Sequence, residues 1–223
     1  MISIAIDGPA GAGKSTLSKA VAAKLGFIYV DTGALYRTVG LKFMNLGHNT
    51  ELNCDIEKIL SDTDISIKFV NGEQRVMLDG EDVSDLIRTP EASMMASAVS
   101  AKPPVRAFLL EMQRKLAREN NVIMDGRDIG TVVLPNASLK IFLTASVETR
   151  AGRRYRELIQ KGMDVSYDDI LKDMEKRDYN DSHREIAPLK PAEDSVLADT
   201  SGCEFDESMQ ILLNIINERL NIA

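Results

Sequence analysis

The 223-residue sequence lacks an excess of basic residues, a set of spaced cysteines and any long apolar run. Its net charge is −7, and nucleic-acid binding needs clustered excess lysine and arginine, so we expect no nucleic-acid partner. The two cysteines, Cys54 and Cys203, have no metal-binding or redox spacing and fit a reducing cytoplasm. No apolar run reaches the roughly 20 residues of a membrane span, and the first residues lack the basic segment of a signal peptide. We therefore expect a cytoplasmic protein with no membrane partner, and a monomer, because no segment demands a partner helix.

The phosphate-loop pattern G-x-x-x-x-G-K-[ST] is matched by residues 8–16, Gly8-Pro9-Ala10-Gly11-Ala12-Gly13-Lys14-Ser15-Thr16. An apolar run ending at Asp7 predicts a strand before it, and the apolar spacing after Lys14 predicts a helix that ends near Gly26. Glycines let backbone N–H groups face a phosphate, and the helix adds the positive end of its dipole. We expect Lys14 to reach the β- and γ-phosphates and Ser15 to ligate Mg²⁺. The alternative, a glycine turn with no ligand, fits this context less well.

Alternating strand and helix patterns predict an α/β fold with a five-stranded parallel sheet covered by helices on both faces. The strands are expected near residues 2–7, 27–30, 122–125, 139–143 and 195–200. A small antiparallel insert is expected at about 63–85, because alternating apolar residues flank the turn signal Asn71-Gly72. Pro103-Pro104 is expected to end a helix at 91–101 and to separate it from another at 105–119.

Polar residues follow two of the expected strands, at the edge where an open parallel sheet binds ligands. Asp31 and Thr32 end the strand at 27–30, where they suit a helix N-cap and ligand contact equally well. Asp125 ends another strand and resembles the strand-end aspartate that helps to hold Mg²⁺ beside a phosphate loop.

Arginines are spaced so that they share helix faces in the second half of the chain. Two such faces are predicted: Arg150, Arg153 and Arg154 on one helix, and Arg177, Asp181 and Arg184 on the next. Arg106 lies in the first turn of a helix, where a cation is unfavourable against the dipole, which indicates placement for an anion. A solvated charged face is the alternative. Guanidinium groups concentrated beside a phosphate loop in an acidic chain favour phosphate binding instead.

These features together predict a small-molecule kinase. The sequence has no Asn-Lys-x-Asp segment of the kind that reads guanine in GTPases and no long coupling domain of a motor. A monophosphate acceptor has a second pKa near 6, so it needs no general base, and catalysis reduces to alignment and charge stabilisation. Residues 155–185, flanked by Gly152 and Gly162, are the expected lid that excludes water. The alternative from another class is a nucleotide-binding module without catalysis.

Four segments carry a family resemblance: Ile6-Asp7-Gly8-Pro9-Ala10-Gly11-Ala12-Gly13-Lys14, Asp31-Thr32-Gly33-Ala34-Leu35-Tyr36-Arg37, Asp125-Gly126-Arg127-Asp128-Ile129-Gly130-Thr131-Val132-Val133, and Arg177-Asp178 with Ala187-Pro188-Leu189. Together with the insert at 63–85, they resemble the bacterial cytidylate kinases over essentially the whole chain. The resemblance implies transfer of a phosphoryl group from MgATP to CMP or dCMP. It also implies a P-loop NTPase fold with a core at 1–47, 86–150 and 186–223, a monophosphate-binding insert at about 48–85 and a lid at about 151–185.

The resemblance also implies a set of site residues. Around CMP it places Thr32, Arg37, Ser97, Arg106, Arg127, Asp128, Arg177, Asp181 and Arg184. On ATP it places residues 8–16 with Arg150 and Arg154, and for catalysis it implies Lys14, Arg127, Arg154 and Arg184.

Individual roles follow from the same resemblance. Arg37, Arg127 and Arg184 would lie near the acceptor phosphate. Arg106 and Asp128 would serve the base or sugar, and Arg177 and Asp181 the sugar hydroxyls. Thr32 stands where the family often has Ser, and Ser15 where some members have Gly, so both hydroxyls are present here. The nearest alternatives are small P-loop kinases of AMP, UMP, shikimate or dephospho-coenzyme A, which lack the insert paired with an Asp-Gly-Arg-Asp segment.

Overall fold

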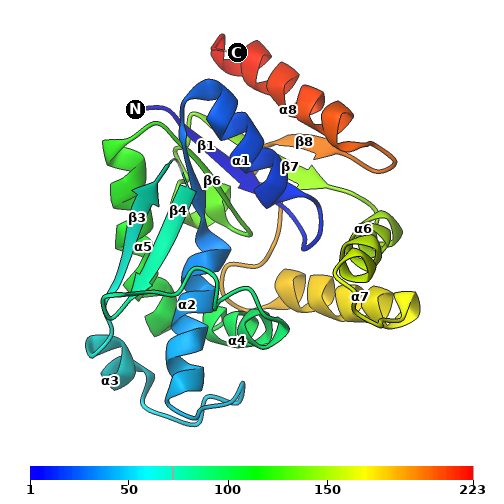
Figure 1. Cartoon of the computed structure of the whole chain (residues 1–223). Helices are drawn as coiled ribbons and strands as arrows, with labels where there is room; N and C mark the ends of the chain where they lie inside the picture. Colours follow the sequence, from blue (N-terminus) through cyan, green and yellow to red (C-terminus); the bar gives the residue numbers. More distant parts are fainter. Residues whose placement is uncertain (72, 223) are drawn as a thin grey trace.

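Strands and helices alternate along residues 1–71 and 73–222, which this computed structural model describes (Figure 1). The elements are β1 Ser3–Asp7, α1 Lys14–Leu25, β2 Ile28–Asp31, α2 Thr32–Asn45, α3 Ile56–Ser61, β3 Ile65–Val70, β4 Glu73–Leu78, β5 Glu81–Asp82, α4 Pro90–Ser100, α5 Pro103–Glu119, β6 Val122–Gly126, the π-type turn η1 Ile129–Val133, β7 Leu139–Thr144, α6 Val147–Gln160, α7 Tyr167–His183, β8 Val196–Asp199 and α8 Phe205–Leu220. The expected core boundary at Ala223 lies outside the described residues.

The central sheet has five strands in the order β2-β6-β1-β7-β8, and every neighbouring pair is parallel. The prediction of a five-stranded parallel sheet is therefore confirmed. β1 lies in the middle, so the phosphate loop that follows it emerges at the centre of the carboxyl edge. Asp31, Asp125 and Asp7 end three neighbouring strands at that edge, as the register pairs Asp31 with Asp125 and Asp7 with Gly126.

Successive side chains of β1 point to opposite faces of the sheet, and each face has its own cover. Ile4 and Ile6 pack in a cluster with side chains of α1 and α8, whereas Ala5 packs on the other side with residues of η1 and α5. All three β1 residues are fully buried. The sheet is therefore a middle layer, as its almost entirely apolar strands require.

The predicted antiparallel insert is present as a three-stranded sheet in the order β3-β4-β5. β3 and β4 pair so that Val70 faces Glu73, and Asn71 adopts the positive φ of 52° that a tight hairpin turn favours. Gly72, the other half of the expected turn, lies outside the described residues. The insert joins α2, α3, α4 and α5 around a second apolar core that includes Phe43 and Leu109.

The predicted break between two helices is confirmed, but the expected start of the second helix at Val105 was wrong. α5 begins at Pro103 itself, so the two prolines form its first turn. The first helical N–H groups have no partner within the helix, so proline costs nothing there and its fixed φ favours the start. Among residues 1–71 and 73–222, the helices are all too short or too polar to cross a lipid bilayer.

Candidate active site

The phosphate loop connects β1 to α1, and its backbone packs closely against β7. Gly8 has a φ of 150°, and a Cβ there would lie 1.9 Å from the carbonyl oxygen of Leu143 on β7. Gly13 is the N-cap of α1 with a φ of 86° and offers no side chain to the helix. The first N–H groups of α1 therefore have no side-chain cap and face the loop, which is the arrangement that binds phosphate at a helix N-terminus.

Lys14 is held inside this loop. Its side chain is buried, and Nζ donates to the backbone oxygen of Pro9 over 2.7 Å. Burial and, to a smaller extent, the nearby guanidinium of Arg127 lower the pKa of Lys14 to about 7, against the attraction of Asp125. A triphosphate beside Nζ would favour the ammonium form and reverse this shift.

Ser15 and Asp125 form a small oxygen-rich cluster next to Lys14. Ser15 Oγ donates to Asp125 Oδ2 over 2.8 Å, and the Tyr29 hydroxyl donates to Asp125 Oδ1 over 3.0 Å. Burial and the adjacent carboxylate of Asp31 together raise the pKa of Asp125 to about 6. Mg²⁺ prefers oxygen ligands and commonly takes one or two carboxylates beside substrate phosphates, so this cluster fits Mg²⁺.

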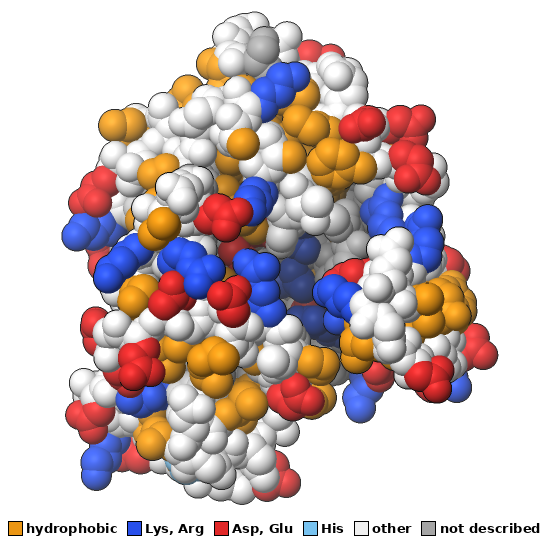
Figure 2. Space-filling view, viewed as in Figure 1, with side chains coloured by type: hydrophobic (Ala, Val, Ile, Leu, Met, Phe, Trp, Pro, Cys, Tyr) orange, Lys and Arg blue, Asp and Glu red, His pale blue; other side chains and the backbone are white. Residues whose placement is uncertain are grey.

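One cavity of about 450 Å³ joins the phosphate loop to the arginines (Figure 2). Lysine and arginine side chains gather around the hollow in the middle of the visible face. Its described lining carries eight basic side chains against five acidic ones, although the whole chain is acidic. The basic residues are Lys14, Arg37, Arg106, Arg127, Arg153, Arg154, Arg177 and Arg184.

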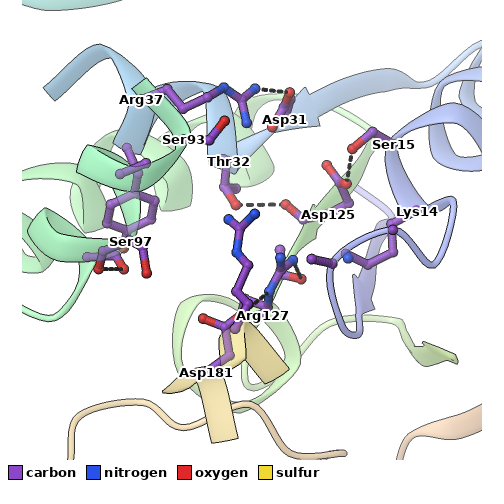
Figure 3. A pocket seen from close by; sticks show the side chains of 18 of the residues that line it. Lys14, Ser15, Asp31, Thr32, Arg37, Ser93, Ser97, Asp125, Arg127 and Asp181 are labelled. Atoms are coloured by element: carbon purple, nitrogen blue, oxygen red, sulfur yellow. Dashed lines mark hydrogen bonds and ion pairs between the residues drawn. The ribbon is translucent and has the colours of Figure 1, made fainter. Parts of the chain in front are cut away.

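Carboxylates hold several of these guanidinium groups in place (Figure 3). Asp128 accepts from Arg106 and, over 3.3 Å, from Arg184. Arg127 Nε donates to Asp181 over 2.7 Å. Such pairing fixes the orientation of planar guanidinium groups and leaves further N–H donors free for a phosphate.

Two guanidinium groups of this lining retain unused donors. The Nε atoms of Arg37 and Arg177 are buried without a hydrogen-bond partner among the described residues. Burial lowers the pKa of Arg177, as does the adjacent Arg127. A buried donor without a partner is costly, so an anionic ligand that accepts from these groups would stabilise the site.

Asp31 and Thr32 lie where β2 meets α2, and Asp31 fills the N-cap role predicted for this position. Asp31 caps α2 by accepting from the backbone N–H of Ala34 over 2.8 Å, and it also pairs with Arg37 over 2.9 Å. Thr32 Oγ1 donates to the backbone oxygen of Asp125 over 2.7 Å. Both residues line the cavity.

The structure brings most of the expected site residues to this one cavity. All nine residues expected around CMP line it, together with Arg154 and six of the nine phosphate-loop residues, Ala10, Gly11, Gly13, Lys14, Ser15 and Thr16. Arg150 does not line it. Its guanidinium is buried, pairs with Asp178 over 2.6 Å and donates to the backbone oxygen of Ala10 over 3.0 Å. The structure thus places Arg150 behind the loop rather than facing the cavity.

Several lining residues were not assigned to the site by the family resemblance. Arg153, which helical spacing had grouped with Arg150 and Arg154, lines the cavity and donates to the backbone oxygens of Thr200 and Cys203. Ser93 and Ser100 extend the Ser97 face of α4 by one turn in each direction, a helical period that the sequence also carries. Tyr36, whose ring centroid lies 5.8 Å from Cζ of Arg106, was not singled out by any spacing pattern.

Comparison with known proteins agrees with this geometry. The cytidylate kinase family model matches residues 4–218. The cytidylate kinase of Caldicellulosiruptor bescii is 55% identical over 214 residues, 96% of this chain and 95% of that protein. That of Carboxydothermus hydrogenoformans is 49% identical over 219 residues, 98% of this chain and 99% of that protein. A solved structure of an uncharacterized protein from Eubacterium ventriosum shares the fold, with a TM-score of 0.55 and 12% identity over 98% of this chain and 100% of that one. The chain belongs to the cytidylate kinase family.

Proposed function

We infer that this chain is a (d)CMP kinase, which transfers the γ-phosphoryl group of ATP to CMP or dCMP in pyrimidine nucleotide metabolism. The observation that carries this inference is the single cavity that joins a phosphate loop to a second, arginine-rich group. Membership of the cytidylate kinase family over residues 4–218 supports CMP and dCMP as acceptors. The products are CDP or dCDP and ADP.

On the donor side, the phosphate loop binds ATP. The backbone N–H groups of Gly8 and of residues 10–16 would surround the phosphates, and Lys14 would contact the β- and γ-phosphates. Ser15 would hold Mg²⁺ together with the nucleotide phosphates, while Asp125 orients the Ser15 hydroxyl. When bound, Mg²⁺ neutralises charge on the phosphates during transfer. Arg154 approaches ATP from α6, and Arg150 supports the loop through Ala10.

On the acceptor side, the arginines bind a nucleoside monophosphate. Its phosphate is largely deprotonated at neutral pH, so the site needs alignment and positive charge rather than a base. Arg37, Arg127 and Arg184 face the acceptor phosphate in this proposal. The base and sugar are bound by Thr32, Ser97, Arg106, Asp128, Arg177 and Asp181.

We further propose that α6 and α7 form a lid over residues 151–185, and that residues 48–85 complete the monophosphate side. Arg154, Arg177 and Asp181 lie on these two helices and line the cavity, so a movement of the helices would change the site directly. Closure would exclude water, which competes with CMP as an acceptor.

The enzyme is proposed to work as a monomer in the cytoplasm. Both thiols, of Cys54 and Cys203, are free, and a reducing compartment keeps them so. Size-exclusion chromatography with light scattering tests the oligomeric state, and a dimer of about twice 24.6 kDa would contradict it.

A panel of acceptors tests the proposed function. Diphosphate formation is measured with ATP and Mg²⁺ against CMP, dCMP, UMP, AMP, GMP and shikimate. We expect CMP and dCMP to give the highest kcat/KM. Preference for another acceptor would favour a different small kinase, and tight ATP binding with no acceptor at all would favour a nucleotide-binding module.

A further inference from the structure

The π-type turn η1, residues 129–133, directly follows Arg127 and Asp128, two residues of the proposed acceptor site. A five-residue turn of this kind has little stability of its own and is frequently found at functional sites. Its backbone is fixed at both ends by charged side chains from elsewhere in the chain. Neither of these side chains, Asp7 and Arg114, lines the active cavity.

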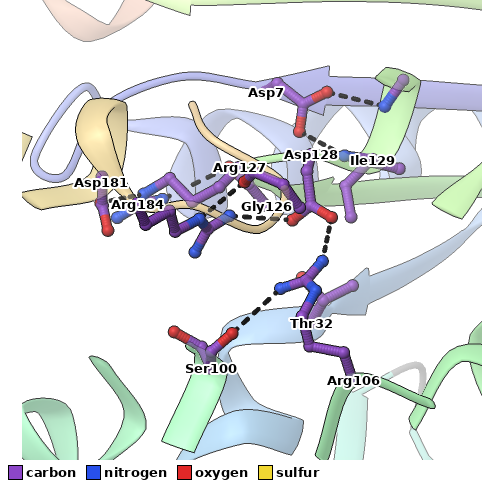
Figure 4. A network of polar contacts seen from close by, with 12 residues as sticks. Asp7, Thr32, Ser100, Arg106, Gly126, Arg127, Asp128, Ile129, Asp181 and Arg184 are labelled. Carbon is purple, nitrogen blue, oxygen red and sulfur yellow. Dashed lines mark hydrogen bonds and ion pairs between the residues drawn. The ribbon is translucent and has the colours of Figure 1, made fainter. Parts of the chain in front are cut away.

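Asp7 holds the N-terminal end of the turn (Figure 4). Its Oδ1 accepts from the backbone N–H of Ile129 and its Oδ2 from that of Gly130, each over 2.7 Å. The backbone of Asp7 also lies opposite Gly126 in the parallel pairing of β1 with β6. Asp7 therefore fixes the chain on both sides of Arg127 and Asp128.

Packing around this contact is tight. Asp7 is only 5% exposed, and a Cβ on Gly130 would lie 3.3 Å from Asp7 Oδ2 and 3.1 Å from the side chain of Lys140. Asp7 is also the last residue before the phosphate loop, so the same residue borders both halves of the site.

Arg114 holds the opposite end. It projects from α5, where Nε donates to the backbone oxygen of Val133 and Nη2 to that of Val132, each over 3.0 Å. The turn thus has a carboxylate on its N–H groups and a guanidinium on its carbonyls, the charge arrangement that stabilises helical backbone.

We propose that Asp7 and Arg114 are positioning residues that clamp η1 and thereby place Arg127 and Asp128 for the acceptor phosphate and nucleoside. The proposal rests on the proposed function, because it assigns those two residues to the acceptor. A displacement of about 1 Å in a group that aligns substrates costs on the order of 100-fold in rate, so a loosened turn would be felt in catalysis.

Kinetics of Arg114 variants test the clamp. Arg114→Met removes both donors, and we expect KM for CMP to rise about tenfold, with KM for ATP and ATP hydrolysis without CMP changed less than about twofold. Arg114→Lys keeps a charged donor and should recover part of the loss. Arg118→Met is the matched control, because Arg118 lies one turn further along α5 and pairs with the exposed Glu111. An unchanged KM for CMP in Arg114→Met, or equal losses in CMP phosphorylation and ATP hydrolysis, would overturn the proposal.

Amide hydrogen exchange tests the clamp without any acceptor. Exchange in peptides covering residues 129–134 should become faster in Arg114→Met and in Asp7→Asn, where one carboxylate oxygen is replaced by an N–H donor, and stay unchanged in Arg118→Met. Unchanged exchange in both variants would overturn the clamp even if CMP is phosphorylated normally. Failure of the wild-type enzyme to phosphorylate CMP would instead overturn the proposed function, and the exchange result would still decide whether the turn is clamped.

Discussion

The proposed donor and acceptor sides of the cavity are built in different ways. The phosphate loop comes from one continuous segment, residues 8–16, and presents mainly backbone N–H groups. The acceptor side comes from α2, α4, α5, the segment after β6 and α7, and presents mainly guanidinium side chains. Backbone donors are positioned by the local fold, whereas guanidinium groups on long side chains need partners such as Asp128 and Asp181 to fix them.

This difference decides what a single substitution should do. A change in the loop removes a group that every reaction with ATP requires, whereas a change among the arginines should separate transfer to CMP from reaction with water.

Lys14→Ala should abolish both phosphoryl transfer to CMP and hydrolysis of ATP. We expect transfer to CMP and acceptor-free ATP hydrolysis to fall by at least about 1,000-fold, because the loop loses the cation that contacts the β- and γ-phosphates. The thermal unfolding temperature should change little, since the substitution removes a buried charge whose one hydrogen bond among the described residues is to the Pro9 backbone. Lys24→Ala, on the exposed last turn of α1, is the control. Near-normal turnover of Lys14→Ala would contradict the donor assignment.

Arg184→Ala should impair transfer to CMP much more than hydrolysis of ATP. We expect kcat/KM for CMP to fall about 100-fold, while slow ATP hydrolysis without CMP stays within a few-fold of wild type. Asp128 retains Arg106 as a partner, so the loss concerns the ligand more than the fold. Parallel measurements of CDP and inorganic phosphate check this. If both activities fell equally, Arg184 would belong to the donor side or to the fold.

Tyr29→Phe should weaken the Mg²⁺ side by a smaller factor. The phenol donates to Asp125 Oδ1, and its removal leaves the carboxylate with Ser15 as its hydroxyl donor. The charged form of Asp125 is then less stabilised, so its pKa rises further above the present value of about 6. We expect the Mg²⁺ concentration for half-maximal activity to rise about three- to tenfold, measured at saturating ATP and CMP. An unchanged Mg²⁺ requirement would remove Asp125 from the metal side.

ATP binding should take up protons above neutral pH. Lys14 has a pKa of about 7, lowered by burial, so at pH 8 it is mostly neutral, whereas the ATP-bound form needs the ammonium. Uptake should therefore approach about one proton at pH 8 and vanish near pH 6, where Lys14 is already protonated. Calorimetry in two buffers of different ionisation enthalpy measures it. Uptake that persists in Lys14→Met would assign the proton to another group.

The same contrast explains how much the sequence could predict. The phosphate loop, the parallel sheet and the antiparallel insert were predictable, because each depends on local spacing and turn chemistry. Arg177 and Asp181 share a face of α7, as helical period predicted, and both line the cavity. The prediction was wrong for Arg184, which follows the last turn of α7 in extended backbone, although its side chain also lines the cavity.

What the sequence could not predict depends on contacts between distant segments. Arg150 and Arg153 have equivalent spacing, yet Arg150 turns to Asp178 and Ala10 while Arg153 reaches the cavity. The turn η1 depends on hydrogen bonds from two distant side chains. Asp7 lies 122 residues before its backbone partner Ile129, and Arg114 lies 19 residues before its backbone partner Val133. Helical period cannot distinguish such cases, because tertiary packing selects the partner.

The central claim is that one cavity holds both a donor and an acceptor, and simultaneous measurement of CDP and inorganic phosphate tests it most directly. With Mg²⁺ and ATP alone, the enzyme should release phosphate slowly. Addition of CMP should produce CDP at a rate at least about 100-fold higher, with little added phosphate release. Phosphate release at the same rate with and without CMP, and no CDP, would contradict the account.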